Sequence, residues 1–147
     1  EDLSLLAPEL PLRAAIAPGL WVSGDRELLA QVLQNLITNA AKYNLPQGWV
    51  RVEAQRQGDQ ARVTVANATT PLTATERQYL FERFYRGEGD RAHRAEGLGL
   101  GLSLAREIAR AHGGDLRLDP SPPGEAHLSL YLPSALPQDL ARIDSKN

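Results

Sequence analysis

Residues 97–114 read GLGLGLSLAREIARAHGG, and this stretch decides the fold because a helical pattern follows directly on a glycine-rich loop. From Ser103 to about His112, apolar and charged residues alternate at the spacing of an amphipathic helix. A glycine at every second position lets backbone N–H groups turn inward, and the first turn of a helix adds unpaired donors with a partial positive charge. The stretch therefore predicts a phosphate-binding loop. For a glycine cluster alone, a flexible hinge before the helix is the alternative.

Other kinds of nucleotide-binding loop fit this stretch poorly. A P-loop ends in Gly-Lys-Ser/Thr, whereas this loop ends in Gly101-Leu102-Ser103. The dinucleotide fingerprint needs a strand directly before its glycines, but residues 88–96 are charged and show no strand pattern. A eukaryotic-type kinase loop needs catalytic and metal-binding partner motifs that this sequence lacks. The polar residues 87–96, which mix both charge signs without a period, are interpreted as a mobile lid beside the loop.

Length and composition fit one small globular domain. The 147 residues suit a single core, which we place in residues 1–134, with residues 135–147 as a C-terminal tail. The formal net charge of −2 and the lack of a basic patch argue against a nucleic-acid partner. The sequence has no cysteine, and its three scattered histidines form no zinc-binding pattern. No stretch resembles a membrane span or a signal peptide.

Periodicity and capping signals predict three helices. The first begins after an N-cap at Asp25 and ends before Pro46, and the second begins at a capping box of Thr73 and Glu76 and runs to about Phe84. The predicted strands are residues 10–16 and 20–22 around a turn at 17–19, 50–54 and 61–65 joined at 57–59, and 115–118 and 126–132 around 120–124. Hairpins interleaved with helices favour an α+β two-layer sandwich, with three main helices on one face of a mixed, mostly antiparallel sheet.

A polar stripe borders the apolar face of the first predicted helix. Gln31, Asn35, Asn39 and Lys42 recur at steps of three and four residues, so they lie along one side of the helix. An amide beside the buried face costs free energy unless something bonds it. Either the asparagines cap neighbouring backbone, or they face the same cleft as the glycine loop. In the cleft, an amide oxygen would suit Mg²⁺, Lys42 would add a charge for a phosphate, and Tyr43 would offer a flat face beside a base.

Three motifs in this order resemble the N, F and G2 boxes of sensor histidine kinases. They are QVLQNLITNAAKY at residues 31–43, LFERFYR at 80–86 and GLGLGL at 97–102. The resemblance covers about residues 25–132, and it implies the ATP-binding module of the superfamily that includes gyrase B, MutL and the large heat-shock chaperone. The fold shared by these proteins is the Bergerat-type sandwich, which has the architecture predicted above.

The resemblance implies a role for each matching residue. Asn39 would coordinate Mg²⁺ with Asn35 assisting, Lys42 would reach the phosphates, and Tyr43 would pack near the adenine or ribose. Arg86 would approach the γ-phosphate, where a guanidinium spreads developing charge, so Arg86 and Lys42 are the implied catalytic residues. The implied ATP-binding set is Asn35, Asn39, Lys42, Tyr43, Asn67, Leu72, Arg86, Gly97, Leu98, Gly99, Leu100, Gly101 and Leu102.

Two positions bear on how the chemistry differs from that of relatives. In ATPases of this superfamily, a glutamate that activates water usually stands four residues before the metal-binding asparagine, whereas this chain has Asn35, which cannot act as a base. The G1 box should contain an aspartate that accepts a bond from the adenine amino group, followed by glycines. Here Asn67 takes the aspartate's place, and Thr69 and Pro71 replace the glycines. Metal-responsive sensor kinases of Gram-negative bacteria look similar at this point.

The resemblance also implies partners that this chain lacks. A helical hairpin that carries the phosphorylated histidine and forms a homodimer should precede the module, so we interpret the chain as a fragment. The full-length protein would be an inner-membrane sensor with this domain in the cytoplasm and a response regulator as its partner, and the isolated domain would be monomeric. The alternatives are a degenerate nucleotide-binding module that acts through protein contacts and an anti-sigma-type serine kinase.

Overall fold

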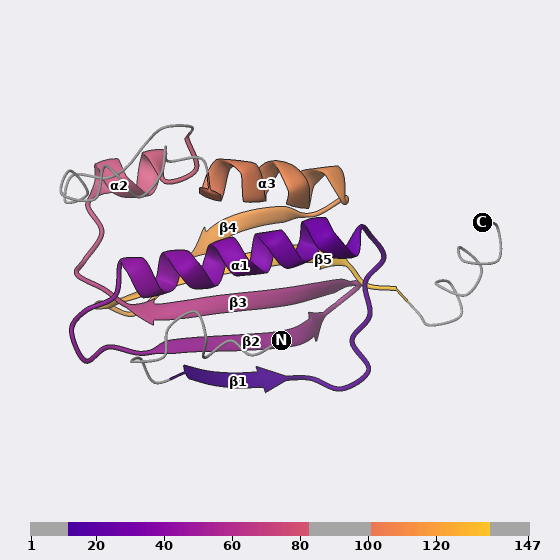
Figure 1. Cartoon of the computed structure of the whole chain (residues 1–147), viewed down its shortest axis with the longest axis horizontal. Coiled ribbons are helices and arrows are strands. Elements are labelled where there is room, and N and C mark those ends of the chain that lie inside the picture. The colour runs from indigo at the N-terminus through magenta and orange to yellow at the C-terminus, as the bar shows by residue number, and fades with distance from the viewer. Residues whose placement is uncertain (1–11, 83–100, 136–147) are drawn as a thin grey trace.

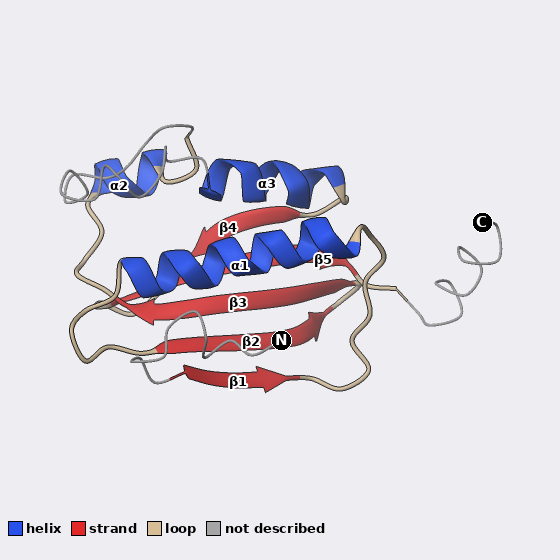
Figure 2. Cartoon of the chain, in the orientation of Figure 1, coloured by secondary structure: helices blue, strands red, loops and turns tan. Residues whose placement is uncertain are grey.

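The computed structural model describes residues 12–82 and 101–135, which form one mixed sheet with helices on one face (Figures 1 and 2). The elements are β1 (Leu12–Ile16), α1 (Arg26–Lys42), β2 (Val50–Gln57), β3 (Gln60–Ala68), α2 (Ala74–Tyr79), α3 (Gly101–Ala111), β4 (Asp115–Asp119) and β5 (Glu125–Pro133). The strand order is β1-β2-β3-β5-β4, with β1 parallel to β2 and every other pair antiparallel. The predicted two-layer sandwich and both predicted hairpins are therefore confirmed.

Apart from strand ends that extend one to three residues beyond the predicted ones, three predictions differ from the structure. Residues 20–22 form no strand, because pairing with β2 ends where the Ala17 N–H reaches Ala54 O (2.8 Å), and Val22 then makes only an isolated bridge to Ser134. The helix α2 ends at Tyr79 instead of continuing toward Phe84, a residue that lies outside the described ranges. The residues after it turn so that Leu80 and Phe81 pack against the core. The third helix begins two residues earlier than predicted.

The core lies between α1, α3 and the sheet face that they cover. The Oδ1 atom of Asp25 accepts from the Leu28 N–H (3.0 Å), which confirms the predicted N-cap. The residues of α1 that are buried in this core are Val32, Leu36, Ile37 and Ala40, and Leu29 and Leu33 pack against it partly buried. The sheet adds Val50, Val52, Val65, Leu116, Leu128, Leu130 and Leu132, and α3 adds Ala105, Ile108 and Ala109.

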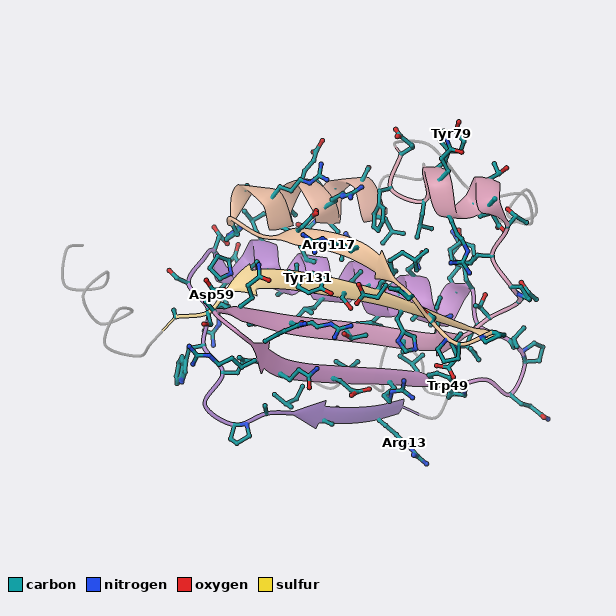
Figure 3. All side chains as sticks on the ribbon, turned by 180° about the vertical axis from the view of Figure 1, so that it is seen from behind. Arg13, Trp49, Asp59, Tyr79, Arg117 and Tyr131 are labelled. Atoms are coloured by element: carbon teal, nitrogen blue, oxygen red, sulfur yellow. The ribbon has the colours of Figure 1, made fainter. Side chains whose placement is uncertain are left out.

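The uncovered face of the sheet is closed by polar side chains (Figure 3). The Tyr131 hydroxyl donates to Asp119 (3.0 Å), and the guanidinium carbons of Arg117 and Arg62 lie 4.9 and 5.7 Å from the centre of its ring. Ser129, on the same strand, is fully buried and donates to the Asp119 carboxylate (2.5 Å). Because Tyr131 and Ser129 reach the same carboxylate, the tyrosine ring lies along the sheet and helps to keep Ser129 from water.

Asp115, at the start of β4, joins the sheet to α3. Its carboxylate accepts from Arg110 (3.0 Å) and Arg106 (3.3 Å) on α3, from Arg117 on β4 (3.3 Å), and from the Leu116 N–H (2.8 Å). Burial by itself would raise the pKa of Asp115. The hydrogen bonds to its charged form outweigh that effect and lower the pKa to about 2. The last turn of α3 is thereby held to the sheet.

Candidate functional site

The polar stripe of α1 lies against the first residue of α3. The Asn35 Nδ2 atom donates to the Gly101 carbonyl (3.3 Å), and Gly101 is the last glycine of the glycine-rich loop. The structure thus brings together two predicted site residues that are 66 positions apart in the sequence. Asn35 bonds a backbone group, as the capping interpretation of the stripe requires, but that group belongs to the glycine loop itself.

Asn39, one turn further along α1, has a different environment. It is half-buried, and among the described residues its side-chain amide makes no hydrogen bond, while its backbone carbonyl accepts from the Tyr43 N–H (3.1 Å). A half-buried amide without a protein partner is costly unless water or a ligand satisfies it. The capping interpretation therefore does not account for Asn39, and its amide can serve a ligand.

A cation and an aromatic ring lie together at the C-terminal end of α1. The Lys42 Nζ atom is 5.1 Å from the centre of the Tyr43 ring, a distance at which an ammonium is attracted by the ring face. Lys42 is half-buried, and Tyr43, the C-cap residue of the helix, is exposed. This end of α1 thus carries a positive charge and a flat apolar surface one turn beyond Asn39.

Asn67 is buried near the end of β3, paired with Val50 of β2. Its Nδ2 atom donates to the Ala68 carbonyl (2.8 Å), and its Oδ1 atom makes no hydrogen bond within the described ranges. The carbonyl thereby fixes which atom of the amide remains available, and that atom is an acceptor. The next residue but one, Thr69, is buried and bonds the Gly124 carbonyl through its N–H (3.0 Å). One backbone hydrogen bond thus connects the altered G1 segment to the β4–β5 turn.

The remaining predicted site residues are placed only in part. Leu102 is half-buried and packs against the core, whereas no hydrogen bond or ring contact in the described part of the chain joins Leu72 to the α1 stripe. The Leu72 carbonyl instead accepts from Arg77 on α2 (3.5 Å). The residues that lie outside the described ranges are Arg86, Gly97, Leu98, Gly99 and Leu100, together with the lid interpreted at 87–96.

Two contacts beside this site have no counterpart among the sequence predictions. The Arg106 guanidinium carbon lies 4.5 Å from the centre of the Phe81 ring, which attaches the start of the F-box motif to α3. The His112 Nε2 atom accepts from the Asp25 N–H (3.1 Å), which attaches the other end of α3 to the start of α1. Helical periodicity could place Arg106 on a polar face, but no local signal identifies a partner so distant in sequence.

Asn67→Asp should tighten ATP binding about three- to tenfold and leave GTP binding unchanged. A charged acceptor makes a stronger bond to the adenine amino group, which outweighs the lost bond from Asn67 Nδ2 to the Ala68 carbonyl, whereas guanine offers an acceptor at the corresponding position and gains no bond. The measurement is calorimetric titration of both nucleotides, with Asn67→Ala as the variant that removes the acceptor. Equal effects of Asn67→Asp on both nucleotides would show that Asn67 does not read the base.

Residues 24–136 match the family described as histidine kinase-, DNA gyrase B- and HSP90-like ATPase. The signal transduction histidine-protein kinase BaeS of Escherichia coli strain K12 is 35% identical over 133 residues, which are 90% of this chain and 28% of BaeS. The chain thus spans little more than a quarter of that relative.

Solved structures show the same fold. The mycobacterial sensor histidine kinase MprB superposes with a TM-score of 0.79 at 27% identity, over 91% of this chain and 90% of that one. The ATP-binding domain of PrrB from Mycobacterium tuberculosis gives a TM-score of 0.70 at 27% identity, over 91% and 87% of the two chains.

Proposed function

Because the chain belongs to the histidine kinase-, DNA gyrase B- and HSP90-like ATPase family, as a catalytic ATP-binding domain of the sensor histidine kinase type, we propose that it donates the γ-phosphoryl group of ATP to a histidine on a helical hairpin outside this chain. The observation that carries the proposal is the Asn35–Gly101 contact, since it sets the amide stripe of α1 beside the helix that follows the glycine loop. The α3 N-terminus would then face phosphate oxygens with unpaired backbone donors.

The side chains of α1 fit Mg²⁺·ATP. The Asn39 amide oxygen suits a hard cation that keeps most of its waters and bridges phosphates, and its amide has no protein partner in the described ranges. No group of three His, Cys, Asp or Glu side chains that could hold a metal occurs in residues 12–82 and 101–135, so the ion would be held jointly by Asn39 and the nucleotide. When bound, Mg²⁺ would neutralise charge on the phosphates. Lys42 would add a second cation, and Tyr43 would pack against the base or ribose.

The reaction is transfer to an external nucleophile in place of hydrolysis. The imidazole nitrogen of the hairpin would form a bond to the γ-phosphorus as the bond to the β–γ bridging oxygen breaks; ADP leaves, and the imidazole releases its proton to solvent. Asn35 supports this assignment because an amide cannot deprotonate water, and its nitrogen is already engaged with Gly101. Arg86 would stabilise charge on the departing phosphoryl group.

The full-length protein would be a homodimeric sensor of the inner membrane, with this domain in the cytoplasm and a response regulator as the acceptor of the phosphoryl group from the hairpin. The isolated domain would be monomeric. In the part of the chain that the structure describes, no helix is long and apolar enough to cross a membrane. The hairpin and the membrane segments would belong to other parts of the protein, and the regulator would be a separate chain.

The proposal is tested by mixing the domain with its separately produced histidine hairpin and γ-labelled ATP. We expect label on the hairpin alone, at a rate that rises with hairpin concentration because no linker provides an effective concentration. The label should be acid-labile and base-stable, and chelation of Mg²⁺ should abolish transfer. Label on the isolated domain, or none on the hairpin at any concentration, would contradict the kinase assignment. Absence of ATP binding would favour the degenerate module instead.

A further inference from the structure

His112 lies directly after α3 and bonds two helices at once. Its Nδ1 atom is 2.8 Å from the Ile108 carbonyl oxygen, and its Nε2 atom is 3.1 Å from the Asp25 backbone nitrogen. A carbonyl only accepts and a backbone N–H only donates, so Nδ1 carries the proton and Nε2 is unprotonated. A single neutral tautomer therefore satisfies both helices.

The bond to Asp25 completes the first turn of α1. In α2, Thr73 and Glu76 form a reciprocal capping box within the helix, and Glu76 accepts the N–H of the cap residue. In α1, Asp25 caps the Leu28 N–H, but Leu28 has no side-chain acceptor to return a bond. His112, 87 positions away, accepts the Asp25 N–H in its place. A side chain that follows α3 thus completes the hydrogen bonding at the N-terminus of α1.

The surrounding backbone is shaped for the imidazole ring. A Cβ atom at Gly24 would overlap the ring, with the Nε2 atom only 2.9 Å away, and would also press on Leu29 Cδ1 at 3.0 Å. Gly24 therefore lets the chain pass directly against His112. A substitution there would push the ring away from Asp25 or shift the start of α1.

The two helices are joined at two separate places. Asp25 bonds His112 at the start of α1, and Asn35 bonds Gly101 at the start of α3. Asp25, the N-cap of α1, and Asn35 are ten positions apart, or about 15 Å along the helix axis. Two hydrogen bonds at this separation restrain both the translation of one helix along the other and the angle at which the helices cross. A single hydrogen bond would still allow one helix to rotate about it.

We propose that His112 is a positioning residue for nucleotide binding. It holds the end of α1 remote from Lys42, so that Asn39 and Lys42 keep their spacing from the phosphate-binding start of α3. This inference rests on the proposed function, because the spacing matters only if the two helices share one ligand. His112 itself does not contact the ligand, and its effect passes through α1.

Three variants separate this role from ordinary stabilisation of a helix start. His112→Asn places a polar atom where Nδ1 lies and keeps a partner for Ile108, but it cannot reach Asp25. His112→Gln reaches the Nε2 position and offers Oε1 as an acceptor for the Asp25 N–H. Asp25→Ala removes the cap on Leu28 but leaves its own backbone N–H bonded to His112.

Titration calorimetry with Mg·ATP should show weaker binding in only one of the three. We expect His112→Asn to raise the Kd at least fivefold, and His112→Gln and Asp25→Ala to stay within twofold of wild type. Equal affinity in all three variants would overturn the proposal. So would a loss in Asp25→Ala as large as that in His112→Asn, because His112 would then only stabilise the helix start.

A second measurement keeps the inference separate from the proposed function. If the wild-type domain binds no Mg·ATP, the proposed function fails. In that case ¹⁵N NMR of His112 in the wild-type domain still tests the hydrogen bond between His112 and the Asp25 N–H. An unprotonated Nε2 that accepts a hydrogen bond supports it, and a protonated Nε2 overturns it. The same spectrum decides the question if His112→Asn does not fold.

Discussion

Asp119→Ala should lower the free energy of unfolding by about 2–4 kcal/mol, because one carboxylate satisfies several donors on the uncovered face of the sheet. Its oxygens accept from Arg62 (2.6 Å), Ser129 (2.5 Å) and Tyr131 (3.0 Å). The Arg62 Nε atom is buried and has no partner among the described residues, so Asp119 is the counter-charge that compensates this guanidinium. Without the carboxylate, the partly buried Arg62 guanidinium would lose its counter-charge, and the fully buried Ser129 hydroxyl would keep only the Thr64 hydroxyl, 2.8 Å away, as a partner among the described residues.

Urea unfolding measures this loss, and Asp59→Ala is the matched control. The Asp59 side chain is exposed at the β2–β3 turn and makes no hydrogen bond or ion pair with the described residues, whereas its backbone carbonyl accepts from Ser134. Its replacement should change stability by less than about 0.5 kcal/mol. A loss below about 1 kcal/mol in Asp119→Ala would mean that water replaces the network at little cost.

The same network predicts how stability depends on pH. Burial alone would raise the pKa of Asp119, but the hydrogen bonds from Ser129, Arg62 and Tyr131 to its charged form outweigh burial and lower the pKa below its ordinary value. A carboxyl with a lowered folded-state pKa stabilises the fold above its unfolded value and loses that contribution as the pH falls through the folded value. Wild type should therefore lose more stability than Asp119→Ala on acidification below about pH 4.

Arg86→Ala should slow phosphoryl transfer to a separate hairpin by about 10²- to 10³-fold, the usual cost of losing a donor that acts on developing charge. ATP affinity should fall only a few-fold, because the guanidinium is needed most as the phosphoryl group departs. Single-turnover transfer rates and calorimetric affinities measure the two effects separately. Arg83, in the same motif, is the control, and Arg83→Ala should retain transfer within threefold. If affinity and rate fell equally in Arg86→Ala, the residue would serve binding of the ground state.

The parts of the fold that the sequence could predict depend on short-range signals. Asp25 caps a helix from three residues away, Thr73 and Glu76 do the same, and alternation along β2, β3 and β5 places their apolar residues on one face. Because these signals act over a few residues, the sequence alone locates α1 and both hairpins. The predicted strand fails at residues 20–22, where strand formation depends on a neighbour that only the folded sheet provides.

The hydrogen bonds that join α1 and α3 at the candidate site could not be predicted in the same way. The motif places Asn35 near the glycine loop, but its partner is the backbone of Gly101, which no side-chain pattern encodes. The acceptor for Asp25 is His112, a residue with no local reason to bond that position. Such contacts follow from the packing of α1 on α3, which is a property of the assembled layers.

The polar side chains around Tyr131, on the uncovered face of the sheet, affect how the domain can move relative to other parts of the protein. A sheet with one apolar face and one face covered by Arg62, Arg117 and a bonded tyrosine needs no permanent partner on its outer side. Under the proposed function, in which the domain binds a nucleotide and then approaches a separate histidine hairpin, it can change its position without uncovering an apolar face of the sheet. The ability of the domain to move between nucleotide and acceptor thus depends on the uncovered face of the sheet, which lies opposite the helices that carry the candidate site.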